Sequence, residues 1–268
     1  MPELPEVETI VRDLAPRVSG RTIARVRHDR KPPVFDRHSL SPKLAVGKTI
    51  ERVWRAGKFL VFDLGEDVHL TVHLRMTGNL LFQRDRRPVE RQRAVIEFSD
   101  GASLVFADVR KFGRMRVLRG DPVATLGLGI DPLAPELDEA AFAAIARGRT
   151  TKVKIFLLDQ RRLAGVGNIY ACEALFEAGI RPGKPVGKLT KAQRERLLRA
   201  LRRILRKAIQ HRGSSVDDYL DAEGKEGEFQ KQLRVYGRAG LPCRRCGTPI
   251  RRVVLGQRGT FYCPVCQR

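Results

Sequence analysis

Four cysteines near the end of the chain constrain its fold more than any other feature. They form two Cys-x2-Cys pairs, Cys243/Cys246 and Cys263/Cys266, with 16 residues between the pairs. Two such pairs let two backbone turns supply four thiolates to one tetrahedral ion, as in structural zinc sites. An iron–sulfur or redox role is the alternative, whereas disulfides suit a secreted chain. We therefore expect a zinc-ribbon hairpin holding one structural Zn²⁺, with a basic tip formed by Arg251, Arg252 and Arg258.

The first half of the chain has the pattern of a helix followed by β-strands. Residues Val7, Ile10, Val11 and Leu14 form an apolar stripe at helical spacing, which predicts a helix from about Pro2 to Val18. Short β-like runs follow, separated by the turn signals Gly57-Lys58, Gly65-Glu66, Gly78-Asn79 and Asp100-Gly101. The predicted strands, whose spacing favours a sandwich or barrel, are Ile50–Trp54, Phe59–Leu64, Val68–Leu74, Ala94–Phe98, Ser103–Ala107 and Arg114–Leu118.

The second half is predicted to be helical after a Gly- and Pro-rich linker at Gly120–Pro135. Asp138 can cap a helix that ends near Gly148, and Thr190 with Gln193 forms a capping box for a helix that runs to about His211. Shorter helices are expected at Lys152–Asp159 and Asn168–Ala178, and the second of these would bury the lone Cys172 as a small apolar residue.

These elements predict an α+β chain with three parts. Residues 1–132 would form an N-terminal helix on a two-layer β-sandwich, 133–235 a helical domain, and 236–268 the zinc finger. The length of 268 residues predicts one to two domains, each large enough for a hydrophobic core.

The net charge of +22 requires a polyanionic partner unless it only reflects a solvated basic surface. Nucleic acid is the first candidate. An anionic membrane is the second, but no basic amphipathic helix carries Trp or Phe anchors, and no apolar run approaches the roughly 18 residues of a membrane span. With no signal peptide at the start, we expect a cytoplasmic, nucleoid-associated protein.

The opening MPELPEVET places a proline directly after the initiator methionine. Prolines and acids suit a helix start, which is the structural explanation. Removal of Met1 would also expose the secondary amine of Pro2, whose pKa of about 8 leaves a useful nucleophilic fraction at neutral pH. An iminium formed by such an amine has no N–H proton to lose, so it acts as a fixed electron sink for elimination.

The chain resembles formamidopyrimidine-DNA glycosylase (Fpg) along its whole length. The resemblance rests on PELPEVE at 2–8, GKFL at 57–60, HLRMTG at 73–78, DVRKFG at 108–113, AGVGNIYACEALFEAGI at 164–180, VYGR at 235–238 and the cysteine module at 243–266. It implies that the helical domain is a helix-two-turn-helix element. It also implies a monomeric, bifunctional enzyme of base excision repair, acting as N-glycosyl hydrolase and as DNA-(apurinic or apyrimidinic site) lyase.

The resemblance assigns the catalytic roles. Pro2 would attack C1′ of the damaged nucleotide, and Glu3 would be the general acid/base. Lys58 would contact phosphate and donate a proton in β-elimination, and Arg258 would hold phosphate and serve δ-elimination.

The same resemblance assigns contacts to double-stranded DNA that contains oxidised bases or abasic sites. Met76, Arg110 and Phe112 match the trio that enters the duplex when the lesion flips out, although a lone Met or Phe at such a place is more often ordinary packing. Lys154 matches a residue linked to oxidised-purine recognition. The positions that match further phosphate or DNA contacts are His73, Arg91, Arg149, Asn168 and Tyr236.

Three positions depart from the common family pattern. Arg91 stands near a place where many relatives have His, Arg149 stands where Lys is common, and DVRKFG replaces DPRRFG. Both arginines keep a positive charge, but Arg91 loses any titration near neutral pH.

Two other functions remain open from the sequence. A close rival is the same chemistry on oxidised pyrimidines, as in the endonuclease VIII branch, although Leu4–Glu8 and Lys154 favour purines such as 8-oxoguanine and formamidopyrimidines. A rival of another class is a DNA-binding zinc-ribbon protein without catalysis, which would not need Pro2, Glu3 and Lys58. The segment Ser214–Gln232 is expected to contact the lesion.

Overall fold

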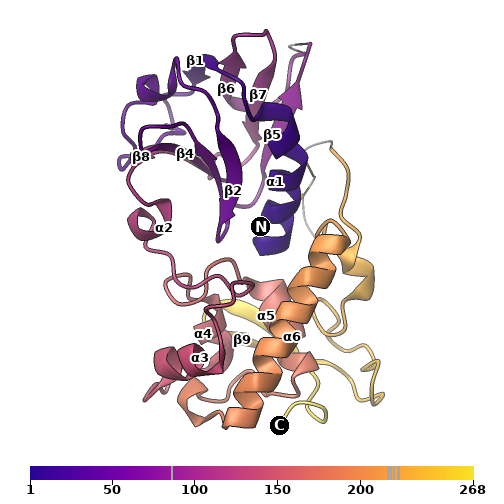
Figure 1. Cartoon of the computed structure of the whole chain (residues 1–268). Coiled ribbons are helices and arrows are strands. Elements are labelled where there is room, and N and C mark those ends of the chain that lie inside the picture. Colours follow the sequence, from indigo (N-terminus) through magenta and orange to yellow (C-terminus); the bar gives the residue numbers. More distant parts are fainter. Residues whose placement is uncertain (86, 216–218, 220, 222–223) are drawn as a thin grey trace. The chain divides into compact units, whose positions relative to one another are not determined.

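The structure is a computed structural model that describes residues 1–85, 87–215, 219, 221 and 224–268. Six positions of the predicted lesion-contacting segment Ser214–Gln232, namely 216–218, 220 and 222–223, lie outside the described residues. The chain folds into two compact units (Figure 1). The first comprises Met1–Leu126 and His211–Glu228, and the second comprises Gly127–Gln210 and Phe229–Arg268. The segment 211–228, which the sequence placed in the helical domain, therefore packs with the N-terminal elements.

The first unit begins with helix α1 (Leu4–Val18) and contains two antiparallel four-stranded sheets. One sheet has the order β1-β6-β7-β5 and the other β2-β3-β4-β8. The strands are β1 (Ile23–His28), β2 (Arg52–Ala56), β3 (Phe59–Asp63), β4 (Val68–His73), β5 (Gly78–Gln83), β6 (Gln92–Phe98), β7 (Ser103–Asp108) and β8 (Arg114–Arg119), with the short helices η1 (Pro42–Ala45) and α2 (Pro122–Thr125).

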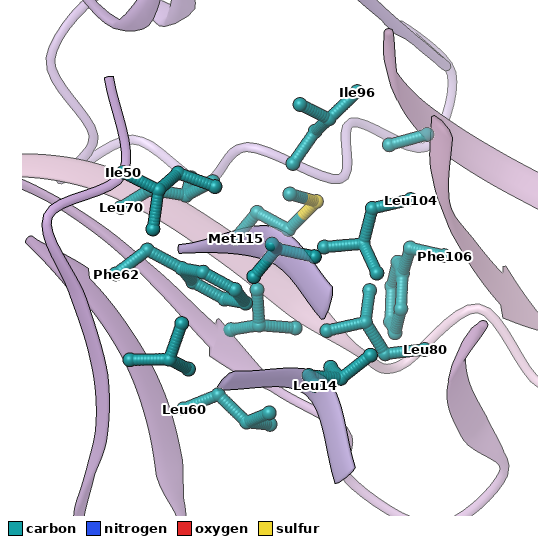
Figure 2. Packing of buried hydrophobic residues seen from close by; sticks show 14 of the residues in the cluster. Leu14, Ile50, Leu60, Phe62, Leu70, Leu80, Ile96, Leu104, Phe106 and Met115 are labelled. Atoms are coloured by element: carbon teal, nitrogen blue, oxygen red, sulfur yellow. The ribbon is translucent and has the colours of Figure 1, made fainter. Parts of the chain in front are cut away.

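Both sheets and α1 contribute to one apolar core, which confirms the predicted sandwich. Figure 2 shows Leu14 of α1 in one cluster with Leu60, Phe62 and Leu70 of one sheet and Leu80 of the other. Each such side chain, when fully buried, stabilises the fold by about 1.5–3 kcal/mol before conformational entropy is counted.

Two strands were not predicted. Strand β1 lies at the edge of its sheet, and its charged, largely exposed residues hide the strand periodicity. Strand β5 begins at Gly78-Asn79, so the prediction of a turn there was wrong. Gly78 is needed for packing, because a Cβ atom there would lie 2.4 Å from the carbonyl oxygen of Leu74.

The second unit is built mainly from helices α3 (Glu139–Ala146), α4 (Val153–Leu158), α5 (Asn168–Glu177) and α6 (Lys191–Gln210). Short helices η2 (Val186–Lys188) and η3 (Phe229–Gln232) and the hairpin β9 (Arg251–Leu255)–β10 (Arg258–Tyr262) complete it. The predicted caps are confirmed: the Asp138 carboxylate accepts from Ala141 N–H at 2.7 Å, and Thr190 and Gln193 exchange reciprocal bonds. Helix α5, including Cys172, is buried along almost its whole length and packs against α6 and β10.

Candidate nucleic-acid interface and zinc centre

The four paired cysteines converge at the base of the β9–β10 hairpin. Their sulfur atoms all lie within 4.8 Å of one another, with 3.9 Å between Cys243 and Cys266 and 3.5 Å between Cys246 and Cys263. Tetrahedral zinc with Zn–S bonds of about 2.3 Å requires sulfur–sulfur separations of roughly 3.8 Å. Backbone N–H groups of Arg245 and Cys266 point at the sulfurs of Cys243 and Cys263 at 3.4 Å, as expected around thiolates. The donor set fits one structural Zn²⁺.

Two buried carboxylates, Glu3 and Glu6, lie at the N-terminus of α1 within four residues of Pro2. Pro2 is buried, and Glu3 and Glu6 are only 3% and 2% exposed. One oxygen of Glu6 accepts from the backbone N–H of Glu3 at 2.8 Å, and the other accepts from the backbone N–H of Ser214 at 2.8 Å. Glu6 therefore fixes the backbone next to Pro2, and no sequence signal marked it as more than a helix-start acid.

Lys58, in the turn before β3, lies close enough to His73, at the end of β4, for their charges to interact. Lys58 follows Gly57 in the β2–β3 turn and is 6% exposed, and Phe59 pairs with His73 across the β3–β4 ladder. Burial lowers the pKa of His73 to about 3, and the positive charges of Arg75 and Lys58 add to that shift. The backbone N–H of Arg75 donates to Nδ1 of His73 at 3.0 Å, so the neutral ring carries its proton on Nε2. His73 thus offers an N–H donor without a charge.

The three residues predicted to enter the duplex, Met76, Arg110 and Phe112, come from two loops that contact each other. The guanidinium of Arg110 lies 3.2 Å from the sulfur of Met76 and 5.1 Å from the ring centre of Phe112. Phe112 is 50% exposed, which is high for a Phe. The structure therefore brings the three predicted residues together, in the β4–β5 and β7–β8 loops.

A buried carboxylate holds these loops. Asp108, 1% exposed, accepts from the Thr77 hydroxyl at 2.5 Å and from the backbone N–H groups of Arg110 and Gly113 at 3.2 and 2.7 Å. Its own backbone N–H donates to the carbonyl of Arg91, which places the exposed Arg91 beside the same loop pair. The sequence had not singled out Asp108, although an acid ending a buried strand was the available signal.

In the second unit, the N-terminus of α5 is joined to the zinc hairpin. The side-chain amide of Asn168 donates to the carbonyl of Gly259 at 3.0 Å. Its Oδ1 atom is buried and has no hydrogen-bond partner among the described residues. Arg258, next to Gly259, is exposed at the start of β10, just after the hairpin tip. Asn168 and Arg258 are therefore near one another, with the α5 N-terminus supplying backbone donors.

Tyr236 is positioned by an acid that sequence reasoning missed. The buried carboxylate of Glu173 in α5 accepts from three consecutive backbone N–H groups, those of Arg234, Val235 and Tyr236, at 2.8–2.9 Å. Burial raises the pKa of Glu173, and these three bonds oppose that rise. The Tyr236 ring packs edge-on against Phe261 of β10 at 5.1 Å between centroids. A single acid inside the apolar run of α5 was the signal.

Lys154 and Arg149 occupy contrasting environments. Lys154 is fully buried in α4, which is unusual for a lysine and consistent with a specific role for its ammonium group. Arg149 is exposed after α3, and its Nε donates to the carbonyl of Ile145 at 2.8 Å.

The helices that the structure describes were also compared with what a membrane span requires. None of them combines the length and the hydropathy of a transmembrane segment.

Comparison with known proteins matches three domain families in chain order. Residues 1–115 match the formamidopyrimidine-DNA glycosylase N-terminal domain, 128–219 its H2TH domain, and 240–268 the zinc finger found in FPG and IleRS. The formamidopyrimidine-DNA glycosylases of Symbiobacterium thermophilum and Herpetosiphon aurantiacus are 44% and 43% identical, each over all of this chain and over 89% and 100% of theirs.

Solved structures agree with these matches. The MutM (Fpg) protein of Thermus thermophilus superposes with a TM-score of 0.88 at 42% identity, covering 99% of this chain and 98% of that one. The Lactococcus lactis Fpg in complex with an abasic-site DNA gives 0.87 at 37% identity, covering 99% of each chain. The same protein bound to a Fapy-dG-containing DNA gives 0.87 at 36%, with 99% and 100% covered.

Proposed function

Since this chain belongs to the formamidopyrimidine-DNA glycosylase family, we propose that it is bifunctional in DNA repair. It would excise oxidised purines, such as 8-oxoguanine and formamidopyrimidines, and then cut the abasic strand by β,δ-elimination. Its partner would be double-stranded DNA containing oxidised bases or abasic sites, bound by a monomer. The observation that carries the proposal is the pair of buried carboxylates beside Pro2, with Glu3 next to it in the chain and Glu6 bonded to the Glu3 backbone N–H.

The chemistry requires Met1 to be removed, because the nitrogen of Pro2 is otherwise an unreactive amide. The free secondary amine attacks C1′ while Glu3 delivers a proton, and the C1′–base bond breaks. The sugar then opens, and a C1′=N⁺ iminium forms with no N–H proton. Loss of a C2′ proton expels the 3′-phosphate, and a second elimination expels the 5′-phosphate. The second elimination removes a C4′ proton, and in both eliminations the iminium nitrogen accepts the electron pair that the departing proton leaves.

The remaining predicted residues would hold the DNA. Lys58 and His73 would donate to a phosphate beside the lesion, one as a cation and the other as a neutral N–H. Met76 and Phe112 would fill the gap left by the flipped nucleotide, and Arg110 would hydrogen-bond the stranded base. Asn168, Tyr236 and Arg258 would bind phosphate, as would Arg91 and Arg149, and Lys154 would act in recognition of the lesion.

Borohydride trapping tests the enzyme proposal. Protein whose intact mass confirms loss of Met1 should form a covalent adduct with DNA carrying 8-oxoguanine, and Pro2→Gly should bind that DNA with far less adduct and strand cleavage. If correctly processed protein forms no adduct, the enzyme proposal is wrong and the alternative, a DNA-binding zinc-ribbon protein without catalysis, is favoured.

A comparison of two substrates decides between the oxidised-purine and the oxidised-pyrimidine branch. Single-turnover excision should be faster for 8-oxoguanine than for thymine glycol if purines are the substrates. The reverse order would favour the oxidised-pyrimidine branch with the same Pro2 chemistry.

A further inference from the structure

One surface of the second unit is strongly basic, and no role proposed so far uses it. Helix α6 contains eight lysines and arginines but one acid, Glu195. Its exposed face adjoins the loop of the first zinc-binding Cys pair. We call this the α6 basic surface, formed by Arg199, Arg202, Arg203, Arg206 and Lys207 of α6 together with Arg234, Arg244 and Arg245.

The surface is continuous. A hollow of about 440 Å³ is lined by Lys207, Arg234, Arg244 and Arg245 and by the ring of Phe176, which Arg245 covers at 4.7 Å. Two further hollows adjoin it, and Lys207 lines all three. From Arg199 to Gln210 the α6 part alone extends about 16 Å, at about 1.5 Å per residue. The cations therefore follow a line and do not form an isolated cup.

Acidic side chains do not balance these charges. The carboxylate of Glu173 is committed to three backbone N–H groups. Glu177 alone faces three arginines, Arg203, Arg234 and Arg245. Within the described part of the chain, Arg206, Lys207 and Arg244 form no ion pair or side-chain hydrogen bond. Such crowding of like charge disfavours the folded state unless an anionic ligand compensates for it.

The surface is separate from the phosphate contact proposed at Asn168. Asn168 begins α5, whereas Phe176 lies eight residues later near its other end. At about 1.5 Å per residue the two positions are about 12 Å apart along the helix. A phosphate bound by Asn168 therefore cannot also occupy the hollow over Phe176.

We propose that the α6 basic surface binds the sugar–phosphate backbone of duplex DNA at phosphates remote from the lesion. Its charged groups are donors only, which selects a ligand rich in acceptors, and guanidinium groups match phosphate geometry well. The linear extent favours a polymer with regularly spaced charges over a small phosphate compound. Duplex DNA carries one charge per about 1.7 Å of helix axis, so several phosphates face a surface of this length. An acidic protein segment is the competing occupant.

A matched pair of variants in the full-length, zinc-loaded protein tests this proposal. Arg206→Gln/Lys207→Gln/Arg244→Gln removes three positive charges from the surface without breaking an ion pair or side-chain hydrogen bond within the described part of the chain. Arg25→Gln/Arg30→Gln/Lys31→Gln removes three exposed charges from the first unit, whose side chains likewise form no ion pair or side-chain hydrogen bond with the residues that the structure describes. Affinity for a long undamaged duplex is measured against salt concentration, and excision is measured on a short lesion duplex.

The slope of log K against log salt is negative, and the surface variant should make it less steep by up to about 2.7, since each phosphate contact contributes about −0.9. The control variant should change it far less, and both should excise from the short duplex at the wild-type rate. Equal slope changes in the two variants would overturn the proposal. So would binding of polyglutamate that depends on these residues while binding of the long duplex does not. If the wild-type protein does not excise the lesion from the short duplex, that result counts against the proposed enzyme function and not against the α6 basic surface.

Discussion

The Glu6 carboxylate accepts a hydrogen bond from the backbone N–H of Ser214 at 2.8 Å, although 208 residues separate them in the chain. The other oxygen of Glu6 accepts from the N–H of Glu3. One buried side chain therefore joins the start of α1 to the 211–228 segment. Gly213, with φ of +82°, allows the close approach, since a Cβ atom there would lie 2.8 Å from Glu6.

Glu6→Gln should destabilise the first unit and reduce excision. The amide replaces one acceptor oxygen by an NH₂ group that faces an N–H donor, and a buried unsatisfied donor costs about 1–3 kcal/mol. Urea unfolding measures the loss. Glu8→Gln, on a less buried side chain of the same helix, is the control. Unchanged stability and excision in Glu6→Gln would show that the bridge contributes nothing.

His73 should make stability depend on pH in acid. Its pKa of about 3 in the folded state lies below the unfolded value of about 6.5, so the unfolded state binds more protons between these values. The contribution of neutral His73 to the free energy of unfolding should therefore be fully present above about pH 6.5. It should fall as pH decreases toward 3, by about 1.4 kcal/mol per pH unit at most.

The comparison is between wild type and His73→Asn, which keeps an acceptor for the Arg75 N–H. Between about pH 6.5 and 4.5 the wild type should lose about 2 kcal/mol more of its unfolding free energy than the variant does. The same loss in both proteins would place the titration elsewhere.

Asp108→Asn should impair base extrusion more than strand cleavage. The amide cannot accept from all the donors that Asp108 now serves, so the loop carrying Arg110 and Phe112 should lose its fixed geometry. Small misplacements of positioning groups cost up to about 100-fold in rate. Single-turnover excision of 8-oxoguanine should fall by about 10-fold or more, with a smaller effect on a preformed abasic site. Thr77→Val, which removes only the hydroxyl partner, should show a weaker form of the same pattern.

Loss of a zinc ligand should disconnect the hairpin from α5. Cys263→Ser should abolish the binding of one zinc ion per chain, because the serine hydroxyl does not lose its proton to a metal as readily as a thiol does. The β9–β10 hairpin should then melt. The Asn168–Gly259 bond would then be lost and DNA affinity should drop. Cys172→Ala, which changes a buried cysteine outside the cluster, should retain one zinc per chain. Full DNA affinity in a zinc-free Cys263→Ser protein would contradict this role of the hairpin.

The sequence predicted features that depend on side-chain pattern. The zinc cluster follows from cysteine spacing, α1 from its apolar stripe, and α3 and α6 from their capping residues. Edge strand β1 was missed because exposure removes its alternation, and β5 because glycine at its start serves packing instead of a turn. The supporting carboxylates Glu6, Asp108 and Glu173 were missed because each binds a partner far along the chain, 208, 31 and 61 residues away. A local sequence pattern, which reveals a helix cap, does not pair two distant segments.

The arrangement of the first unit also determines when it can fold during synthesis. Residues 211–228 belong to it, and Tyr219 from this segment lies in its core. A ribosome that has made the sandwich strands has therefore not yet supplied the side chain that completes their core. The helices of the second unit up to α6 emerge in between, so the N-terminal unit reaches its final packing only after they have been translated. Expression of residues 1–126 alone would yield a sandwich that lacks its last core residue.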